Sequence, residues 1–267
     1  MSDRPQGDDW WLASDGKWYP PQSRTQPPPP STAAIPSQPV PAASYGAPTP
    51  TAPQPGVQSS RRYVSAGLNG TLFAFQIAAA ALAMLAGVMY LGTYALWQDY
   101  RNGGPTSFSE VLDVADASDA VAGVWAICAL VVFILLVIWC NHAYKAALSR
   151  GPSRTSWSSG WAVGGWFIPL ANFVIPKLVI NEIDRMAQPH LEEPIGDSWR
   201  SQRRTAVSDV WWVFWIVGIV VSQIGDTLAT SDIELLWVST VGYLILGTGF
   251  ILGAIAIRKI GKRLTPR

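Results

Sequence analysis

The chain has 267 residues, of which 49% are hydrophobic and 14% charged, and its 19 basic and 18 acidic residues nearly cancel. This balance excludes a strongly basic nucleic-acid binder and an acidic solvating tail, so we expect no nucleic-acid partner. Composition alone does not separate a soluble from a membrane protein, but the charged residues are distributed very unevenly along the chain.

Residues 1–21 form a short tryptophan-rich module. Its dipeptide Asp15-Gly16 is flanked by aromatic residues, which is a strong signal for a β-hairpin. Because an isolated hairpin is only marginally stable in water, we expect Trp10–Tyr19 to dock on a partner, either another protein or the membrane interface.

A proline-rich segment follows, in which Arg24 carries the only charge between Pro20 and Ser60. Such a composition cannot bury enough apolar surface to fold, so residues 22–62 are predicted to be a disordered linker with polyproline II character. A plain spacer is the favoured interpretation. A ligand for proline-binding modules, through Pro27–Pro30, is the alternative.

Four long runs without Asp, Glu, Lys or Arg follow within residues 63–267. About 20 apolar residues in a helix cross a hydrocarbon layer of roughly 30 Å, so we predict spans at about 68–97, 121–143, 210–225 and 235–257. The third run is short, but Trp211, Trp212 and Trp215 crowd one end of it, as aromatic side chains do at the level of lipid headgroups. The predicted fold class is an all-α membrane protein with four transmembrane helices.

A fifth apolar segment, at about 157–180, is interrupted by glycines and prolines. If it crossed the bilayer, the loop 226–234, which has no Lys or Arg, would move inside and the basic tail would move outside, against the positive-inside rule. Broken backbone at membrane depth needs protein or water partners. We therefore predict a re-entrant or interfacial broken helix that enters and leaves on the cytoplasmic side.

The positions of basic residues predict the topology. Arg61 and Arg62 precede the first span, whereas the loop 99–119 holds one base and five acids. The connection 145–209 carries eight bases and the tail 258–267 carries five. These counts predict a multi-pass protein of the cell membrane with both the N- and C-termini in the cytoplasm.

The run Trp157-Ser158-Ser159-Gly160-Trp161-Ala162-Val163-Gly164-Gly165-Trp166-Phe167-Ile168-Pro169-Leu170-Ala171-Asn172 is followed by Pro176, by Asn181-Glu182-Ile183 and by a downstream Trp pair. With Asn141, this order of residues resembles an actinobacterial membrane family described as domain of unknown function 4328. The resemblance covers about residues 68–262 and leaves out the N-terminal module and the linker. It implies a multi-span fold and assigns no activity.

Catalytic and metal-binding patterns were sought without success. Neither His142 nor His190 has a second His or Cys at helical spacing, and Cys128 and Cys140 lie too far apart on one predicted helix to form a disulfide. No hydroxyl residue of a predicted span has a neighbouring His or Lys in sequence. The prediction is therefore a protein without catalytic, cofactor-binding or metal-binding residues, and not an enzyme.

The predicted spans contain no Asp, Glu, Lys or Arg, and amide side chains inside them are few. Transport paths usually carry ionisable residues, so Gln76 and Gln223 are interpreted as hydrogen-bond partners between helices. Asn172, between two prolines, is the best candidate for a site, although capping of freed backbone is the favoured role. Small residues four positions apart predict helix packing at Gly249 and Gly253. The candidate structural or interaction residues of the broken segment are Trp161, Gly164, Gly165, Trp166, Pro169, Asn172, Pro176 and Glu182.

These observations favour a non-enzymatic membrane scaffold or partner-binding subunit with a flexible cytoplasmic arm. A small-solute transporter or channel component is the alternative. The expected partners are the lipid bilayer and a protein bound through Trp10–Tyr19 or the linker, and a homo-oligomer is compatible with the sequence.

Overall fold

The computed structural model describes residues 11–12, 18–19, 61–228 and 231–266. The chain divides into two units, Met1–Gln54 and Pro55–Arg267. In the first unit, β1 (Trp11–Leu12) pairs antiparallel with β2 (Trp18–Tyr19), with Trp11 opposite Tyr19. The strand pair expected around Asp15-Gly16 is therefore present. Its turn, and the predicted linker 22–62 apart from its last two residues, lie outside the described residues.

Four long helices dominate the second unit: α1 (Ala66–Arg101), α2 (Phe108–Leu148), α5 (Ala206–Leu228) and α6 (Asp232–Leu264). Each is long and apolar enough to cross a membrane. The all-α, four-span fold predicted from the charge-free runs is confirmed.

The helix α2 begins well before the predicted span, inside the acidic stretch that was expected to be a loop. Ser107 and Glu110 form a capping box, in which each side chain accepts a hydrogen bond from the backbone N–H of the other residue. Carboxylates are costly in lipid but not in a helix that lies in water. The helix therefore extends beyond the span that charge alone delimits.

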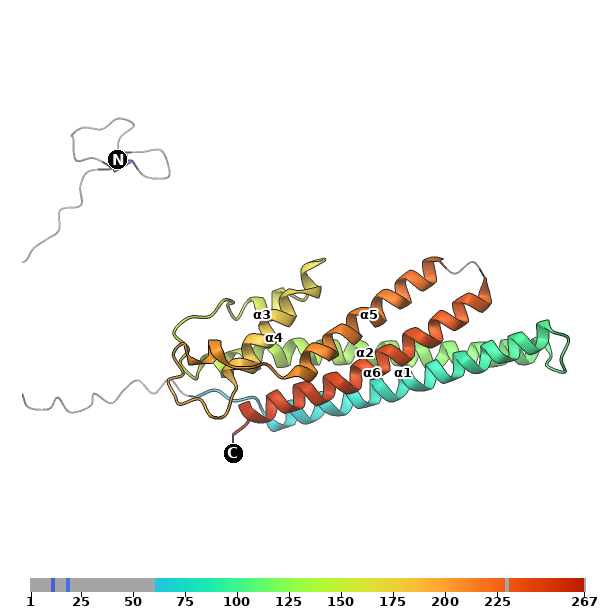
Figure 1. Cartoon of the computed structure of the whole chain (residues 1–267), viewed down its shortest axis with the longest axis horizontal. Coiled ribbons are helices and arrows are strands. Elements are labelled where there is room, and N and C mark those ends of the chain that lie inside the picture. Colours follow the sequence, from blue (N-terminus) through green and yellow to red (C-terminus); the bar gives the residue numbers. More distant parts are fainter. Residues whose placement is uncertain (1–10, 13–17, 20–60, 229–230, 267) are drawn as a thin grey trace, which may run out of the picture. The chain divides into compact units, whose positions relative to one another are not determined.

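Each long helix packs against the next in the order α2, α1, α6, α5. Figure 1 shows α1 and α6 side by side along most of their length. Within the described residues, α2 and α5 do not pack along each other. The long helices have two ends. At the end that we call the basic end, the N–H of Val64 donates to the carbonyl of Leu264 at 3.0 Å. At the other, which we call the acidic end, the chain passes from α1 to α2 and from α5 to α6.

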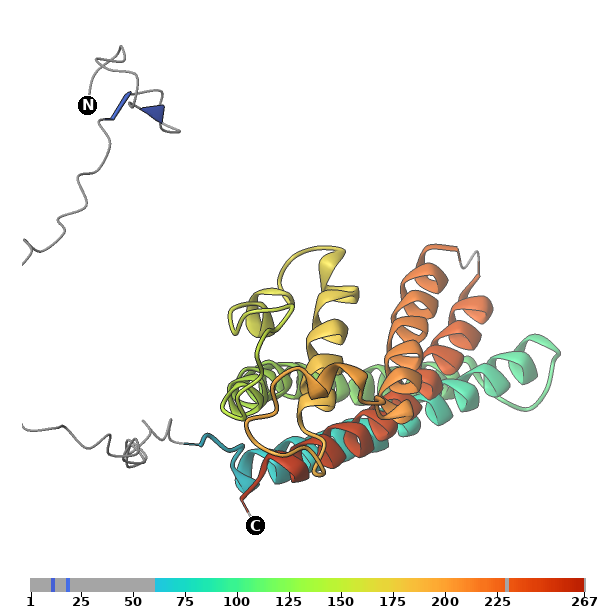
Figure 2. The same cartoon turned by 60° about the vertical axis from the view of Figure 1, so that its left-hand side comes forward.

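Short helices fill the connection between α2 and α5. They are α3 (Trp161–Gly164), η1 (Ala171–Phe173), α4 (Ile175–Met186) and η2 (Ser198–Ser201). Both α3 and α4 pack on α2. In Figure 2, α4 and α5 rise on the same side of the paired α1 and α6.

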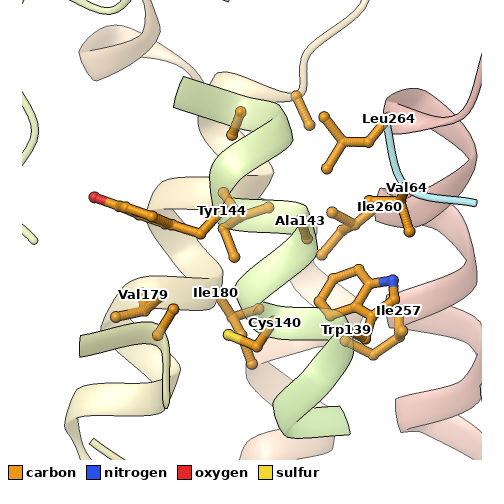
Figure 3. Close-up of a cluster of buried hydrophobic side chains, with 14 of the residues drawn as sticks. Val64, Trp139, Cys140, Ala143, Tyr144, Val179, Ile180, Ile257, Ile260 and Leu264 are labelled. Carbon is orange, nitrogen blue, oxygen red and sulfur yellow. The ribbon is translucent and has the colours of Figure 1, made fainter. Parts of the chain in front are cut away.

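The hydrophobic core at the basic end joins this connection to the spans. Figure 3 shows α2 in the middle of the cluster, with Ile257 and Ile260 of α6 on one side and Val179 and Ile180 of α4 on the other. The central side chains of α2 are fully buried; they are Trp139, Cys140, Ala143 and Tyr144. The broken segment is thus fixed to the same core as the long helices.

Candidate functional site

The connection from Gly160 to Met186 reaches between the long helices and returns to the basic end. At its far point the ring of Phe173 lies 6.4 Å from that of Trp215 on α5. At 1.5 Å per residue, Trp215 lies about 14 Å along α5 from Ala206. The turn of the segment therefore lies beside the middle of Ala206–Gln223, the part of α5 that is apolar enough to cross a membrane.

The break in the helix leaves backbone N–H and C=O groups without helical partners. Tight turns and one side chain supply hydrogen bonds to them. The N–H groups of Trp166 and Phe167 donate to the carbonyls three residues earlier, at 3.2 and 3.1 Å. The indole Nε1 of Trp212 donates to the carbonyl of Phe173 at 2.8 Å. Asn172, which was expected to cap this backbone, contributes no hydrogen bond through its buried Oδ1 among the described residues.

The predicted residues of the broken segment take different places. Trp166 is only 4% exposed and packs edge to face on Phe133, with ring centroids 5.8 Å apart. Gly165 lets the two limbs of the segment approach, because a Cβ there would lie 2.6 Å from the side chain of Ile175. Trp161, Gly164 and Pro169 lie nearer the surface, whereas Pro176 is buried at the start of α4.

Glu182 and Asp184, both on α4, are buried. The carboxylate of Glu182 accepts hydrogen bonds from the hydroxyl of Tyr144 at 3.0 Å and from the N–H of Ser156 at 2.7 Å. Asp184 is 0% exposed and forms an ion pair with Arg263 of α6, with N and O 2.8 Å apart. These two carboxylates join α4 to α2 and α6. The sequence alone gives no sign of these pairings, because Tyr144 and Arg263 lie 38 and 79 residues away from their partners along the chain.

Lys177 joins α4 to the start of α5. Its Nζ lies 2.9 Å from a carboxylate oxygen of Asp209 and donates to the hydroxyl of Ser208 at 2.7 Å. Burial lowers the pKa of Lys177 from its ordinary value, and the neighbouring Asp209 opposes this effect.

A cavity of about 1080 Å³, which we call the groove, lies between α2 and α5, with α1 and α6 at its back. Its lining extends from Trp97 and Phe108 near the acidic end to Trp166 and Trp212, which form its floor. Aromatic rings make up much of the lining in between, including Trp125, Phe133, Trp215, Tyr243 and Phe250. The broken segment thus occupies the half of the space between α2 and α5 at the basic end, and the groove occupies the rest.

Two buried polar atoms belong to residues that line the groove and lack partners among the described residues: Oε1 of Gln76 and Nε1 of Trp125. Gln76 is only 2% exposed, so the hydrogen bond between helices expected for it is not formed by this oxygen. Native proteins satisfy nearly all buried polar groups, and each one left without a partner costs about 1–3 kcal/mol. The lining of the groove therefore includes a residue with an unpartnered acceptor and one with an unpartnered donor, besides the polar residues Thr93, Asp119, Ser222, Gln223, Asp232 and Ser239.

The tryptophans at the start of α5 are buried, which corrects their assignment to a headgroup belt. Trp211 and Trp212 are 4% and 6% exposed. Trp211 packs on Gly253 of α6, where an added Cβ would lie 2.6 Å from the indole Nε1. A Cβ added at Gly249 would lie 3.5 Å from the backbone N of Trp215. The two glycines predicted for helix packing therefore lie under α5.

The family described as Domain of unknown function (DUF4328) matches residues 105–257, which is more than half of the chain. The match begins just before α2, includes the whole broken segment and ends within α6. No curated protein and no solved structure matches the chain. The four-span architecture and the broken segment between α2 and α5 are thus the architecture of a family member, and the chain belongs to the DUF4328 family.

Proposed function

We propose that the membrane domain is a non-enzymatic binding protein that holds an amphipathic molecule of the bilayer in the groove. The observation that carries this proposal is the aromatic cavity of about 1080 Å³, whose lining residues include two with unpartnered polar atoms. Pockets that enclose drug-sized ligands measure roughly 300–1,000 Å³ and combine apolar walls with a few polar groups. The groove fits this description at its upper limit of size.

The groove also helps to distinguish between the two functions expected from the sequence, a scaffold and a transporter or channel component. A scaffold made only of closely packed spans has no use for a cavity of this size. A path for ions or small polar solutes carries ionisable or polar groups along its length. Most of this lining is aromatic or aliphatic, and its two carboxylates, Asp119 and Asp232, come from the parts of α2 and α6 towards the acidic end. Binding of an amphipathic ligand is compatible with a partner-binding subunit, whose docking through Trp10–Tyr19 or the linker is supported by sequence alone.

The ligand is defined by the chemistry of the lining. A long apolar chain would contact the rings of Trp125, Trp215 and Phe250. A hydroxyl or amide group would complete the site, because such groups can donate to Oε1 of Gln76 or accept from Nε1 of Trp125. An alcohol with a long hydrocarbon chain is the simplest molecule that has both properties.

A carrier function is the second candidate, and one observation favours it. The floor of the groove includes Trp166 of the broken segment, and broken helices that reach the middle of the membrane are a common place for transport sites. A displacement of this floor would connect the groove with the basic end. In this case the ligand would not only bind but also cross the bilayer.

We further propose that the basic end faces the cytoplasm. The support is the base count of the sequence, with eight Lys and Arg in the connection 145–209 and one in the loop 99–119. Both ends of the broken segment would then lie on the cytoplasmic side.

Tryptophan fluorescence tests the proposed function. A brominated long-chain alcohol quenches nearby indoles, so titration of the full chain in detergent should show saturable quenching. Ala129→Phe fills part of the groove lining and should weaken this binding at least tenfold. Ala126 lies on the same helix, is exposed and is outside the groove lining. The variant Ala126→Phe should therefore bind the alcohol like the parent chain. Non-saturable quenching, or equal binding by the two variants, would refute the proposal.

A further inference from the structure

A second cavity, of about 250 Å³, lies at the basic end, and we call it the basic pocket. Its wall on α4 consists of Leu178, Asn181, Glu182 and Arg185. The opposite wall combines the stretch after α2 with η2 and the residues that lead to α5: Ser156, Trp157, Trp199, Arg200 and Arg204. It shares no lining residue with the groove.

Three guanidinium groups and one carboxylate line the basic pocket. The carboxylate, that of Glu182, already accepts hydrogen bonds from Tyr144 and Ser156. Arg200 forms an ion pair with Asp197, with Nε and Oδ1 3.3 Å apart, and Asp197 is not part of the lining. Arg204 lies 3.5 Å from Asp209, a carboxylate that is closer to Lys177, at 2.9 Å. Arg185 has no ion pair within residues 61–228 and 231–266, so the pocket has a surplus of positive charge.

Three polar atoms of residues in this lining are buried without a hydrogen-bond partner among the described residues. They are Nε of Arg185, Nε1 of Trp199 and Oδ1 of Asn181. Trp199 and Asn181 are 4% and 7% exposed, so bulk water does not readily satisfy them. The residues that carry these two donors and one acceptor all line one small cavity. A ligand or water held there can satisfy them, and buried polar groups in native proteins are rarely left unbonded.

We infer that the basic pocket binds a phosphate group with an adjoining hydroxyl, as found in glycerol phosphate. Guanidinium groups match the geometry and the charge of phosphate oxygens, and the indole N–H adds a donor. The hydroxyl donates to Oδ1 of Asn181, a bond that the dianionic phosphate group of a monoester cannot make itself because it has no O–H. The pocket is smaller than the roughly 300–1,000 Å³ of sites that enclose drug-sized molecules, as suits a headgroup-sized ligand.

Glycerol phosphate occurs as a soluble molecule, and the same groups form the headgroup of phosphatidylglycerol. Two arms of one experiment distinguish these two sources of the ligand. In the first arm, glycerol phosphate is titrated into the full chain in detergent and followed by calorimetry. In the second arm, the chain is placed in bilayers of phosphatidylcholine with and without phosphatidylglycerol, and retained lipids are identified by native mass spectrometry. Saturable binding in the first arm assigns a soluble ligand, and selective retention of phosphatidylglycerol in the second assigns the lipid headgroup.

Matched variants test the residues. Arg185→Gln removes the unpaired guanidinium, and Trp199→Phe removes the indole N–H while it keeps an aromatic ring. Each should weaken binding at least fivefold. Arg203→Gln removes one exposed charge from the same stretch but outside the pocket and should leave binding within twofold of the parent chain.

The inference is overturned if neither arm shows binding, or if the three variants lose affinity equally, since the attraction would then be a general effect of positive charge. Retention of binding by Trp199→Phe and Arg185→Gln together also overturns it. Ala129→Phe in the groove should not change phosphate binding, so failure of the proposed groove function and failure of this inference are separate results.

Discussion

The indole nitrogen of Trp212, on α5, donates a 2.8 Å hydrogen bond to the carbonyl oxygen of Phe173 in the broken segment. In a bilayer such a carbonyl has no water to bond, so it needs a protein partner. The side chain of one spanning helix thus completes the backbone of the segment beside it. The same indole belongs to the floor of the groove, which makes the site and the local fold interdependent.

Trp212→Phe removes this donor and keeps most of the ring. We expect the free energy of unfolding to fall by about 1–3 kcal/mol, because a buried carbonyl loses its partner. Chemical or thermal unfolding in one detergent measures the change. Trp237→Phe is the control, since Trp237 is 51% exposed; equal losses in both variants would show that the bond to Phe173 contributes nothing.

Gly253→Ala should destabilise the protein by about 1–3 kcal/mol through overpacking, because the new Cβ would lie 2.6 Å from Nε1 of Trp211. At Gly123 of α2 an added Cβ meets nothing within 4 Å. Gly123→Ala should therefore stabilise the helix by about 0.5–1 kcal/mol. In detergent, the melting temperature should therefore fall for Gly253→Ala and rise for Gly123→Ala. If both substitutions raise the melting temperature, α5 does not lie against α6 at this glycine.

Asp184→Asn should cost about 3–5 kcal/mol of unfolding free energy, as expected when one partner of a buried ion pair is removed. A double-mutant cycle with Arg263→Gln isolates the pair, and the double variant should lose less than the sum of the single losses. Asp197→Asn breaks an exposed pair, whose side chains are 49% and 63% exposed, and should change stability by less than about 1 kcal/mol. Strict additivity in the cycle would contradict the pairing of α4 with α6.

The spans were predictable because lipid excludes charge, so four charge-free runs delimit them. The start of α2 at Phe108 was not predictable. Acidic residues there indicate that the segment lies outside the lipid, but they do not prevent it from being helical. Burial of Glu182 and Asp184 was also hidden, since their partners lie far away in sequence. Trp211 and Trp212 show the same limit: tryptophan occurs at headgroups and inside cavities alike, and only packing against α6 and the broken segment decides between them.

Cysteine labelling tests the proposed orientation. In a chain with Cys128 and Cys140 replaced by alanine, Ser109→Cys at the acidic end should react with an impermeant thiol reagent added to intact cells. Ser201→Cys at the basic end should react only after the membrane is opened. Both positions are exposed in the structure, whereas Thr230, in the loop 226–234 that the sequence predicts to lie outside, is not among the described residues. Reaction of Ser201→Cys in intact cells would reverse or refute the topology.

Native mass spectrometry of the full chain, extracted from its own membrane in a mild detergent, tests the groove most directly. We expect a retained amphipathic molecule of defined mass on the parent chain and on Ala126→Phe, and its loss from Ala129→Phe. The groove would have no specific ligand if the parent chain carried no bound molecule, or if Ala129→Phe retained the same molecule in the same amount.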